Sequence, residues 1–241
     1  MIRSLVLLVV LPVYTILAGL VSIPVAALTG SSYWLYRLGR LGVRLGLLLA
    51  GVRLTVVGQG DLPVEQHFIY MMNHASNLDA PAVFLVLTGE VRALGKKELF
   101  NLPVLATAMK MGGFIPIDRS NRDSAIQSMR GAAEIAREGA SFLIAPEGTR
   151  SRDGQLLPFK KGGFYLAIDS GVPAVPITVR GAFELMPPGS FAIRPGTIEI
   201  FFHEPIPTSN LTHKDRSRLV EVVRERIGSR LSAEVPDPAS G

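Results

Sequence analysis

His74 is the only histidine in the chain with an aspartate, Asp79, five positions after it. A neutral imidazole can accept a proton near neutral pH, and a carboxylate on its other nitrogen fixes the tautomer and stabilises the imidazolium. Positions five apart point away from each other on one helix, so the pair requires a loop that enters a helix. Asn77 or Asp79 as the N-cap, with Pro81 in the first turn, would provide that loop. The spacing therefore predicts a general base.

Other assignments of this histidine stay open. A lone histidine is more often a packed or solvated side chain, and Asp79 could serve only as a helix cap. A metal site is disfavoured, because no second histidine or carboxylate lies at ligand spacing and the chain has no cysteine. The lack of cysteine also excludes disulfides and thiolate catalysis.

Cationic side chains follow several apolar runs that have the composition of strands. Arg150 comes after the run 142–145, and its planar guanidinium suits bidentate contacts with a phosphate, while Gly148 permits close backbone approach. Three other cations also follow expected strands: Lys96, Lys97 and Arg119. Each alone is ordinarily a solvated surface charge. Because the ends of parallel strands converge at one edge of a sheet, the set predicts an anion site there.

The elements that must position these residues alternate between strands and helices. The expected strands are 52–57, 68–72, 91–94, 114–117, 141–145, 174–179 and 197–202. The expected helices are 78–87, 100–111, 124–137 and 211–231, the last of them amphipathic. Short apolar runs separated by helices predict an α/β fold with a mostly parallel central sheet flanked by helices.

The N-terminal part of the chain is strongly apolar. Residues 4–36 contain no Asp, Glu, Lys, Arg or His, a run longer than the ~20 residues that cross a bilayer. Pro12 and Pro24 interrupt this run and favour two shorter helices or one bent helix. A cleaved signal peptide over the first 28 residues is the alternative, with Arg3 as its positive start.

The following segment, 32–51, predicts a helix with a cationic stripe. Its arginines recur at spacings of three and four among leucines, at positions Arg37, Arg40 and Arg44. Such a helix suits the boundary between lipid headgroups and acyl chains. The arginines after the apolar run outnumber those before it, so the remainder of the chain is expected on the cytoplasmic side.

Composition limits the classes of partner. The 241 residues are 48% apolar and 19% charged, which excludes a disordered chain, and Lys plus Arg exceed Asp plus Glu by five. The mean hydropathy is +0.32. The excess of positive charge favours an anionic partner such as a phosphorylated metabolite or anionic lipid. Nucleic acid is disfavoured, because aromatic residues make up 7% of the chain and no recognition motif is present.

These motifs together resemble the membrane-associated glycerolipid acyltransferases, and most nearly the 1-acyl-sn-glycerol-3-phosphate acyltransferases. Four blocks of that family occur in their usual order: 73–79, 113–119, 146–150 and 172–177. The Lys-Lys-Glu-Leu stretch at 96–99 is also typical, and the resemblance extends over about residues 50–210. It implies a membrane-associating helical segment at 1–50 and a catalytic domain at 51–231. The sequence of the final residues, 232–241, independently predicts a disordered tail.

The resemblance also implies an activity. A fatty acyl group would pass from acyl-CoA or acyl-ACP to the sn-2 hydroxyl of lysophosphatidic acid, giving phosphatidic acid, without a covalent acyl-enzyme, a cofactor or a metal. His74 would be the general base, Asp79 would orient its ring, and Arg150 would hold the acceptor phosphate. The implied substrate-binding residues are Lys96, Lys97, Phe114, Ile115, Arg119, Glu147, Gly148, Thr149, Arg150 and Pro176.

The expected location is the cytoplasmic face of the inner cell membrane, held by a shallow anchor in preference to a full span. Two alternatives stay open. One is an acyltransferase for another acceptor, such as a lyso-ornithine lipid, another lysophospholipid or glycerol 3-phosphate. The other is a non-enzymatic membrane adaptor that binds phospholipids. The sequence does not determine acyl-chain preference or oligomeric state.

Overall fold

All the apolar runs expected to be strands pair into one seven-stranded sheet in the computed structural model, which describes residues 2–63 and 65–231. The strands are β1 Val52–Val57, β2 Ile69–Met72, β3 Val91–Lys96, β4 Ile115–Ile117, β5 Ser141–Ile144, β6 Ala174–Arg180 and β7 Gly196–Phe202. Their order across the sheet is β1-β7-β6-β2-β5-β3-β4. The final ten residues, 232–241, expected to be disordered, lie outside the described residues.

The sheet is mostly parallel, as expected. β6 and β7 pair antiparallel, and every other pair of neighbouring strands is parallel. β1 and β7 therefore run opposite to the other five strands. β2 lies near the middle, between β6 and β5, so the loop that follows Met72 emerges at the carboxyl edge of the parallel part. Ligands bind at this edge in open α/β sheets.

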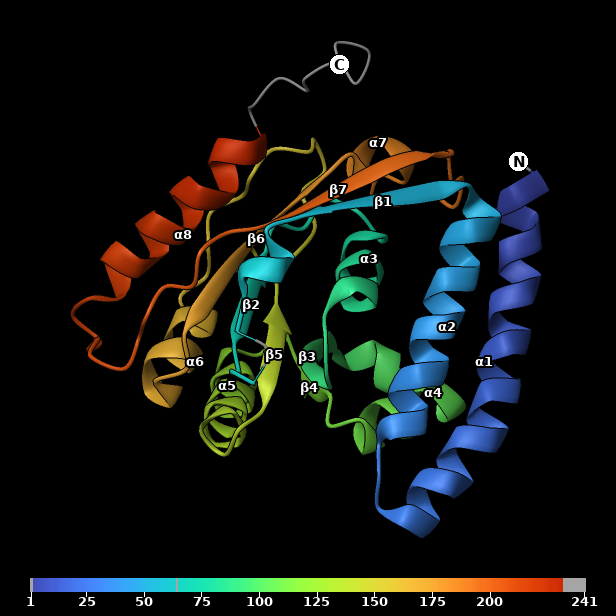
Figure 1. Ribbon diagram of the computed structural model, residues 1–241, viewed down its shortest axis with the longest axis horizontal. Helices are drawn as coiled ribbons and strands as arrows, with labels where there is room; N and C mark the ends of the chain where they lie inside the picture. The colour runs from blue at the N-terminus through green and yellow to red at the C-terminus, as the bar shows by residue number, and fades with distance from the viewer. Residues whose placement is uncertain (1, 64, 232–241) are drawn as a thin grey trace.

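Helices cover both faces of the sheet (Figure 1). One face carries α3 Asp79–Val86 and α7 Ala182–Leu185, and the other carries α5 Arg122–Arg137, α6 Gly162–Ser170 and α8 Arg216–Leu231. Each face of the sheet packs against these helices in an apolar core of its own. Side chains alternate along β2, so Tyr70 and Met72 lie in the core under α3, while Ile69 and Met71 lie in the core under α5, α6 and α8. Burial of each such side chain contributes roughly 1.5–3 kcal/mol.

Two long helices form a hairpin beside the sheet (Figure 1). These are α1 Ile2–Thr29 and α2 Tyr33–Ala50, and α1 also packs on α4 Pro103–Met111. The helices approach closely at glycines: a Cβ on Gly42 would lie 2.5 Å from the Tyr14 ring, and one on Gly19 would lie 2.2 Å from Val104 Cγ1. The hairpin is thus packed against the rest of the fold at α4 as well as through α2.

α1 is one continuous helix, so of the two expected forms, two shorter helices or one bent helix, the first is wrong. Pro12 and Pro24 both lie inside it. Each proline removes one backbone hydrogen bond, while the many other turns keep theirs, so the helix persists through both positions. By length and composition, the stretch Arg3–Thr29 is able to cross a membrane.

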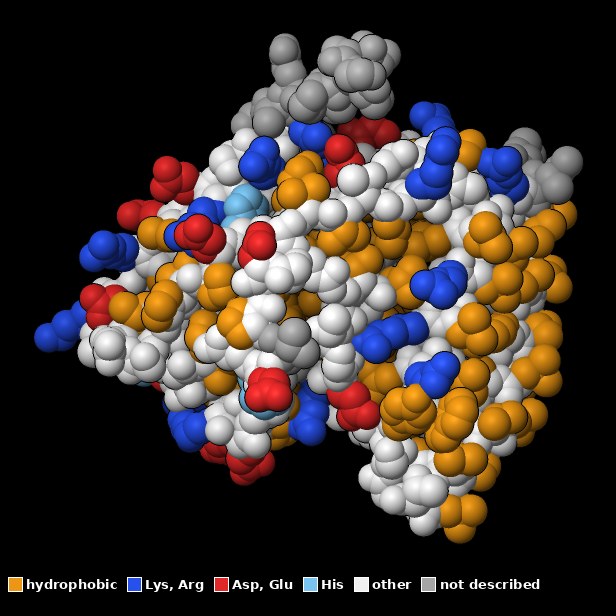
Figure 2. Space-filling model, viewed as in Figure 1, with side chains coloured by type: hydrophobic (Ala, Val, Ile, Leu, Met, Phe, Trp, Pro, Cys, Tyr) orange, Lys and Arg blue, Asp and Glu red, His pale blue; other side chains and the backbone are white. Residues whose placement is uncertain are grey.

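The outer surface of the hairpin is apolar (Figure 2). The large apolar side chains exposed on α1 and α2 include Leu5, Val9, Val13, Ile16, Leu17, Leu20, Leu28, Trp34 and Leu48. A monomer rarely exposes a contiguous apolar patch of this kind unless it contacts another apolar phase. The patch indicates association of this hairpin with a membrane.

The arginines of α2 do not form one solvated stripe. Arg37 and Arg44 are exposed, whereas Arg40 is half-buried and donates to the carbonyl oxygens of Leu87, at 2.8 Å, and Gly89. Arg40 therefore fixes α2 to the loop after α3, and two arginines of the expected three face outward.

The helices differ from expectation in several places. α6 and α7 were not expected, and two expected helices begin later. The helix expected from residue 100 is split into a 3-10 turn, η2 Lys97–Asn101, and α4, because Pro103 begins a new helix at its first position. The helix expected from 211 begins at Arg216, after turns at 209–215. A further 3-10 turn, η1 Gln59–Asp61, follows β1.

Candidate active site

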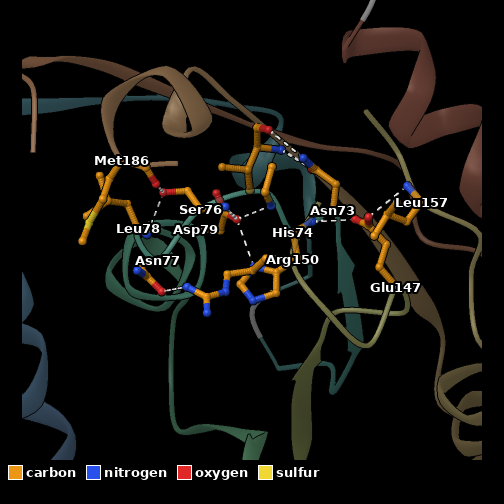
Figure 3. Close-up of polar contacts among 12 residues, drawn as sticks. Asn73, His74, Ser76, Asn77, Leu78, Asp79, Glu147, Arg150, Leu157 and Met186 are labelled. Atoms are coloured by element: carbon orange, nitrogen blue, oxygen red, sulfur yellow. Dashed lines mark hydrogen bonds and ion pairs between the residues drawn. The ribbon is translucent and has the colours of Figure 1, made fainter. Parts of the chain in front are cut away.

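The loop between β2 and α3 brings His74 and Asp79 together (Figure 3). The Nδ1 atom of His74 lies 2.9 Å from Oδ2 of Asp79. The histidine side chain is 13% exposed and the aspartate is fully buried. The same Oδ2 atom also accepts the backbone N–H groups of Ala75, at 2.7 Å, and Ser76, at 2.6 Å. Three donors thus hold the carboxylate in one orientation.

The expected cap arrangement is wrong in detail. α3 begins at Asp79 itself, the preceding residue is Leu78, and no side chain caps the helix. Asp79 instead turns back toward the loop and binds its N–H groups, which lie before the helix. This contact folds the loop so that residues five apart in sequence meet.

The pair has a defined chemical capacity. With the Nδ1–H of His74 donated to the Asp79 carboxylate, Nε2 carries the lone pair and can accept a proton. The carboxylate then stabilises the positive charge that forms on the ring. Asp79 Oδ1 is buried without a hydrogen-bond partner among residues 2–63 and 65–231.

Two residues that we did not single out from the sequence fix the start of this loop. Asn73 pairs through its side chain with the backbone of Val179: Nδ2 donates to the carbonyl at 2.8 Å, and Oδ1 accepts the N–H at 2.7 Å. Ser76 donates from Oγ to the Met186 carbonyl at 2.7 Å. Both side chains are buried. Only their position beside His74 could have indicated them, because their partners lie more than 100 positions away.

Glu147 supports His74 from the neighbouring strand. Its Oε1 accepts the backbone N–H of His74 at 2.6 Å, and its Oε2 accepts that of Leu157 at 3.0 Å. The side chain is 2% exposed, and this burial raises the pKa of the carboxyl group above its usual range. Both oxygens are occupied inside the protein. The structure therefore does not place Glu147 in the direct contact with the acceptor that the resemblance implied.

Arg150 also connects the turn after β5 to the loop between β2 and α3 (Figure 3). Its guanidinium donates to Oδ1 of Asn77, and the backbone N–H of Ser151 donates to the carbonyl of His74 at 2.8 Å. Arg150 remains partly exposed. The guanidinium group is thus held beside the loop of His74, and its other N–H donors are available to bind an anion.

Arg119 approaches Arg150 from the end of β4. The pKa of the Arg119 guanidinium lies below its ordinary value, first because neighbouring atoms reduce its solvation and then because of the positive charge of Arg150. Two guanidinium groups that repel each other in this way favour an anion between them. The expected convergence of cations at the carboxyl edge is thus observed for this pair.

The two lysines after β3 are less available. Lys97 Nζ lies 2.6 Å from Asp118 Oδ2, and Lys96 Nζ lies 3.6 Å from Glu98 Oε2. Hydrogen bonding to Asp118 raises the pKa of Lys97 above its usual value. Each lysine is therefore paired with an acidic residue. Arg119 forms no ion pair within the described part of the chain, although the charge of Glu98 acts on it from a greater distance.

The remaining expected residues fall into different surroundings. Gly148 adopts a φ of +68°, in the left-handed region that favours glycine, and Thr149 is exposed in the same turn. The Phe114 ring packs beside those of Tyr36 and Phe84, at centroid distances of 6.2 and 6.1 Å.

Two expected binding residues are part of the packed fold. Ile115 packs against the core under α5 and α6. Pro176 is buried within β6, opposite Met71 of β2. Met71 is the second-last residue of β2, so Pro176 lies near the carboxyl end of the strand that leads to His74. Its contact with substrate stays a prediction.

Acidic and histidine side chains do not gather elsewhere in a way that would hold a metal. Among residues 2–63 and 65–231, no group of three or more His, Asp or Glu side chains has the arrangement of a metal site.

The sequence and fold are similar to those of known proteins. The chain is 38% identical over 185 residues to a 1-acyl-sn-glycerol-3-phosphate acyltransferase of Limnanthes douglasii, covering 74% of this chain and 66% of that protein. It is 40% identical over 139 residues to 1-acyl-sn-glycerol-3-phosphate acyltransferase BAT2 of Brassica napus, covering 57% and 40%. The match extends over less than two thirds of the length of both plant proteins. With 1-acyl-sn-glycerol-3-phosphate acyltransferase alpha of Homo sapiens it is 30% identical over 210 residues, covering 87% and 74%.

The crystal structure of the 1-acyl-sn-glycerophosphate acyltransferase PlsC from Thermotoga maritima has the same fold. The two chains superpose with a TM-score of 0.83 at 23% identity, covering 98% of this chain and 97% of that one. The sequence profile that describes the Acyltransferase family matches residues 53–180, which include both loops of the site. This chain belongs to the Acyltransferase family.

Proposed function

We propose that this chain transfers a fatty acyl group from a thioester to the sn-2 hydroxyl of lysophosphatidic acid, giving phosphatidic acid. The observation that carries the proposal is the pairing of His74 with buried Asp79 at the carboxyl edge of the sheet, beside Arg150. The names of the relatives from Limnanthes, Brassica and human support the same reaction.

The reaction needs one base and no covalent enzyme intermediate. The Nε2 atom of His74 accepts the proton of the acceptor hydroxyl while the oxygen attacks the thioester carbonyl carbon. A carbon–oxygen bond forms, the carbon–sulfur bond breaks, and the departing sulfur takes the proton from the imidazolium as a free thiol. Asp79 stabilises the ring while it is charged. General base assistance of this kind contributes about 10²–10⁴-fold.

The acceptor is held by its phosphate. Arg150 and Arg119 supply two guanidinium groups at the edge of the site, and their mutual repulsion is relieved when a phosphate binds between them. Lys96 and Lys97 add positive charge, partly offset by Glu98 and Asp118. Glu147 does not touch the substrate in this proposal and acts as a positioning residue for His74.

The membrane supplies the acceptor and receives the product. The apolar outer face of α1 and α2, with Arg37 and Arg44 exposed on it, supports docking at an anionic bilayer surface. Each such cation adds about 1 kcal/mol near an anionic surface. We assign the docked surface to the cytoplasmic face of the cell membrane and prefer a shallow anchor to a full span.

The test uses the full chain purified in detergent. Lysophosphatidate is supplied with a panel of acyl-CoA and acyl-ACP donors, and the lipid product is identified by mass spectrometry. Phosphatidate is expected from the unmodified protein and not from His74→Ala. His67→Ala is the matched control, because His67 is exposed and precedes β2, at the opposite end of that strand from the loop of His74.

The same panel distinguishes the alternatives. Product with glycerol 3-phosphate or a lyso-ornithine lipid, but not with lysophosphatidate, would assign a different acceptor. Absence of any acylated product, with vesicle binding retained, would identify a non-enzymatic lipid-binding protein and overturn the proposal.

A further inference from the structure

A second concave surface adjoins the site from the other face of the sheet. It is a groove of about 940 Å³ between α5 and α6. Both helices cover the face opposite to α3, away from the α1–α2 hairpin (Figure 1). The groove therefore lies on the face of the sheet opposite to the core that includes Leu7 of α1 and Leu47 of α2.

The groove is strongly cationic. It is lined by five basic side chains, from three different segments of the chain: Arg119, Arg122, Arg130, Lys160 and Lys161. Within residues 2–63 and 65–231, none of these five forms an ion pair. The one acidic residue in the lining, Asp169, is itself paired with His213 at 2.6 Å. Arg119 is already assigned to the acceptor phosphate, where the groove meets the site of His74. The other four cations favour a second, multiply charged anion in this concavity.

The start of α6 adds a backbone donor to these charges. In the described chain, no side chain caps this helix, and the N–H groups of Phe164 and Tyr165 donate to the Lys161 carbonyl. The partly exposed N–H of Gly162 is therefore the backbone donor that a ligand in the groove would meet. Gly162 and Gly163 line the groove at this point. A Cβ on Gly163 would lie 2.4 Å from Ile144 Cδ1, so the helix begins close to the end of β5.

The groove shares a wall with the site of His74. Ala145, Pro146 and Gly148 line it, and Glu147 of the same turn binds the backbone of His74 on the other side. The side chain of Lys160 lies directly over Gly148, where a Cβ would come within 2.7 Å of Lys160 Cδ. A ligand in the groove is thus separated from the catalytic loop by one turn of backbone.

The remaining lining is apolar and partly aromatic. It includes Ile117, Met129 and Leu166, together with the rings of Phe159 and Tyr165. A ligand that suits this surface combines phosphate groups with an apolar or aromatic part. Inorganic phosphate alone would leave most of the groove unfilled.

We propose that this groove binds the phosphate-bearing nucleotide end of a coenzyme A thioester, the acyl donor, and directs its pantetheine arm over the 145–148 turn toward His74. The inference rests on the proposed acyl transfer. The acceptor then approaches from the membrane side, held by Arg150, and the donor from the aqueous side. Two substrates that enter from opposite faces of the sheet can both reach one imidazole.

The experiment compares donors of decreasing charge with the full chain in detergent. These are a palmitoyl thioester of coenzyme A, of coenzyme A without its 3′-phosphate, and of pantetheine, and palmitoyl-ACP is measured in parallel. In Arg122→Glu/Arg130→Glu/Lys161→Glu, the KM for palmitoyl-CoA is expected to rise at least tenfold, with the KM for lysophosphatidate unchanged. The KM for palmitoyl-pantetheine, which has no phosphate, is expected to change less than twofold. Added salt should raise the KM for palmitoyl-CoA more in the unmodified protein than in the variant.

Arg53→Glu is the matched control, because Arg53 is an exposed cation on β1 at the far edge of the sheet, and its donor KM should not move. An unchanged KM for palmitoyl-CoA in the triple variant would overturn the groove assignment while leaving acyl transfer intact. A raised KM for palmitoyl-ACP alone would also overturn it, since the groove would then dock a carrier protein. Absence of turnover by the unmodified protein with every thioester would instead contradict the proposed function itself.

Discussion

The Glu147 carboxylate accepts the backbone N–H of His74 at 2.6 Å across a sequence separation of 73 residues. This hydrogen bond joins the turn after β5 to the turn after β2. It fixes the backbone that carries the imidazole, whereas Asp79 fixes the ring. The catalytic geometry therefore depends on two carboxylates with different partners.

The first prediction concerns this backbone contact. Glu147→Gln retains the size of the side chain, but its amide can accept only one of the two N–H groups that the carboxylate binds. We expect kcat to fall about 10–100-fold, because a small displacement of the base is costly, while the KM for lysophosphatidate changes less than twofold. Steady-state kinetics of Glu147→Gln measures kcat and KM. Glu138→Gln is the control, because Glu138 is exposed at the end of α5.

A rise in the KM for lysophosphatidate at constant kcat would contradict the positioning role. It would favour instead the direct contact with the acceptor that the family resemblance implied for Glu147. Circular dichroism of the variant is needed alongside, since both oxygens of the native side chain are buried in hydrogen bonds.

The second prediction concerns the tautomer of His74. In Asp79→Asn, the amide can present its NH₂ group to Nδ1, which favours the wrong tautomer and removes the lone pair from Nε2. We expect kcat to fall about 10²–10⁴-fold with binding of lysophosphatidate vesicles retained. Kinetics and vesicle co-sedimentation together test this. An Asp79→Asn protein with near-normal kcat would show that the carboxylate is only part of the fold.

The comparison of sequence and structure shows which features a local pattern can reveal. The strands follow from short apolar runs, and His74 and Asp79 follow from a five-residue spacing that only a loop entering a helix can satisfy. The pairing of Asn73 with Val179 depends on strand order across the sheet, which the sequence did not supply. The burial of Pro176 likewise follows from the two strands on either side of β6, which a motif along one segment does not specify.

The surroundings of charged side chains are harder to predict from the sequence than the positions of apolar strands and helices. Arg37, Arg40 and Arg44 have the same spacing, yet Arg40 binds two carbonyl groups after α3 while the others face outward. A long cationic side chain can reach either solvent or a nearby loop, so helical spacing alone does not determine its partner. The cationic groove between α5 and α6 likewise arises only when separate segments are folded together.

The third prediction concerns the acceptor phosphate. Arg150→Ala removes a guanidinium that lies beside the loop of His74, and charge-assisted hydrogen bonds of this kind contribute about 1.5–3 kcal/mol. We expect the KM for lysophosphatidate to rise about 10–100-fold, with a smaller rise in Arg150→Lys, which keeps the charge and loses the fork. Arg152→Ala is the control, an exposed arginine in the same loop. If Arg150→Ala and Arg150→Lys had the same KM for lysophosphatidate as the Arg152→Ala control, Arg150 would not bind the acceptor phosphate.

The fourth prediction concerns the apolar face of α1. Leu5 and Leu20 are each 66% exposed, and burial of a leucine side chain in lipid contributes about 1.5–3 kcal/mol. Leu5→Glu/Leu20→Glu should therefore reduce co-sedimentation with anionic vesicles at least tenfold. Ile126→Glu on α5, 41% exposed and remote from the hairpin, should bind normally. Unimpaired binding of the double variant would mean that another surface contacts the bilayer.

The fifth prediction concerns His203, whose Nε2 lies 2.8 Å from the buried Thr178 hydroxyl. Burial first, and then the charges of Arg226 and Arg230, lower its pKa from the ordinary 6.5 to about 4. Between these two values the unfolded chain binds a proton that the folded chain does not. Stability is therefore complete above about pH 6.5 and falls as the pH approaches 4, by at most about 2 kcal/mol because the ring is partly exposed. Thermal unfolding should show a Tm that falls as the pH is lowered over this range. His203→Gln should reduce this dependence of Tm on pH, whereas the control His67→Gln should leave it unchanged. The same dependence in both variants and the unmodified protein would assign it to other groups.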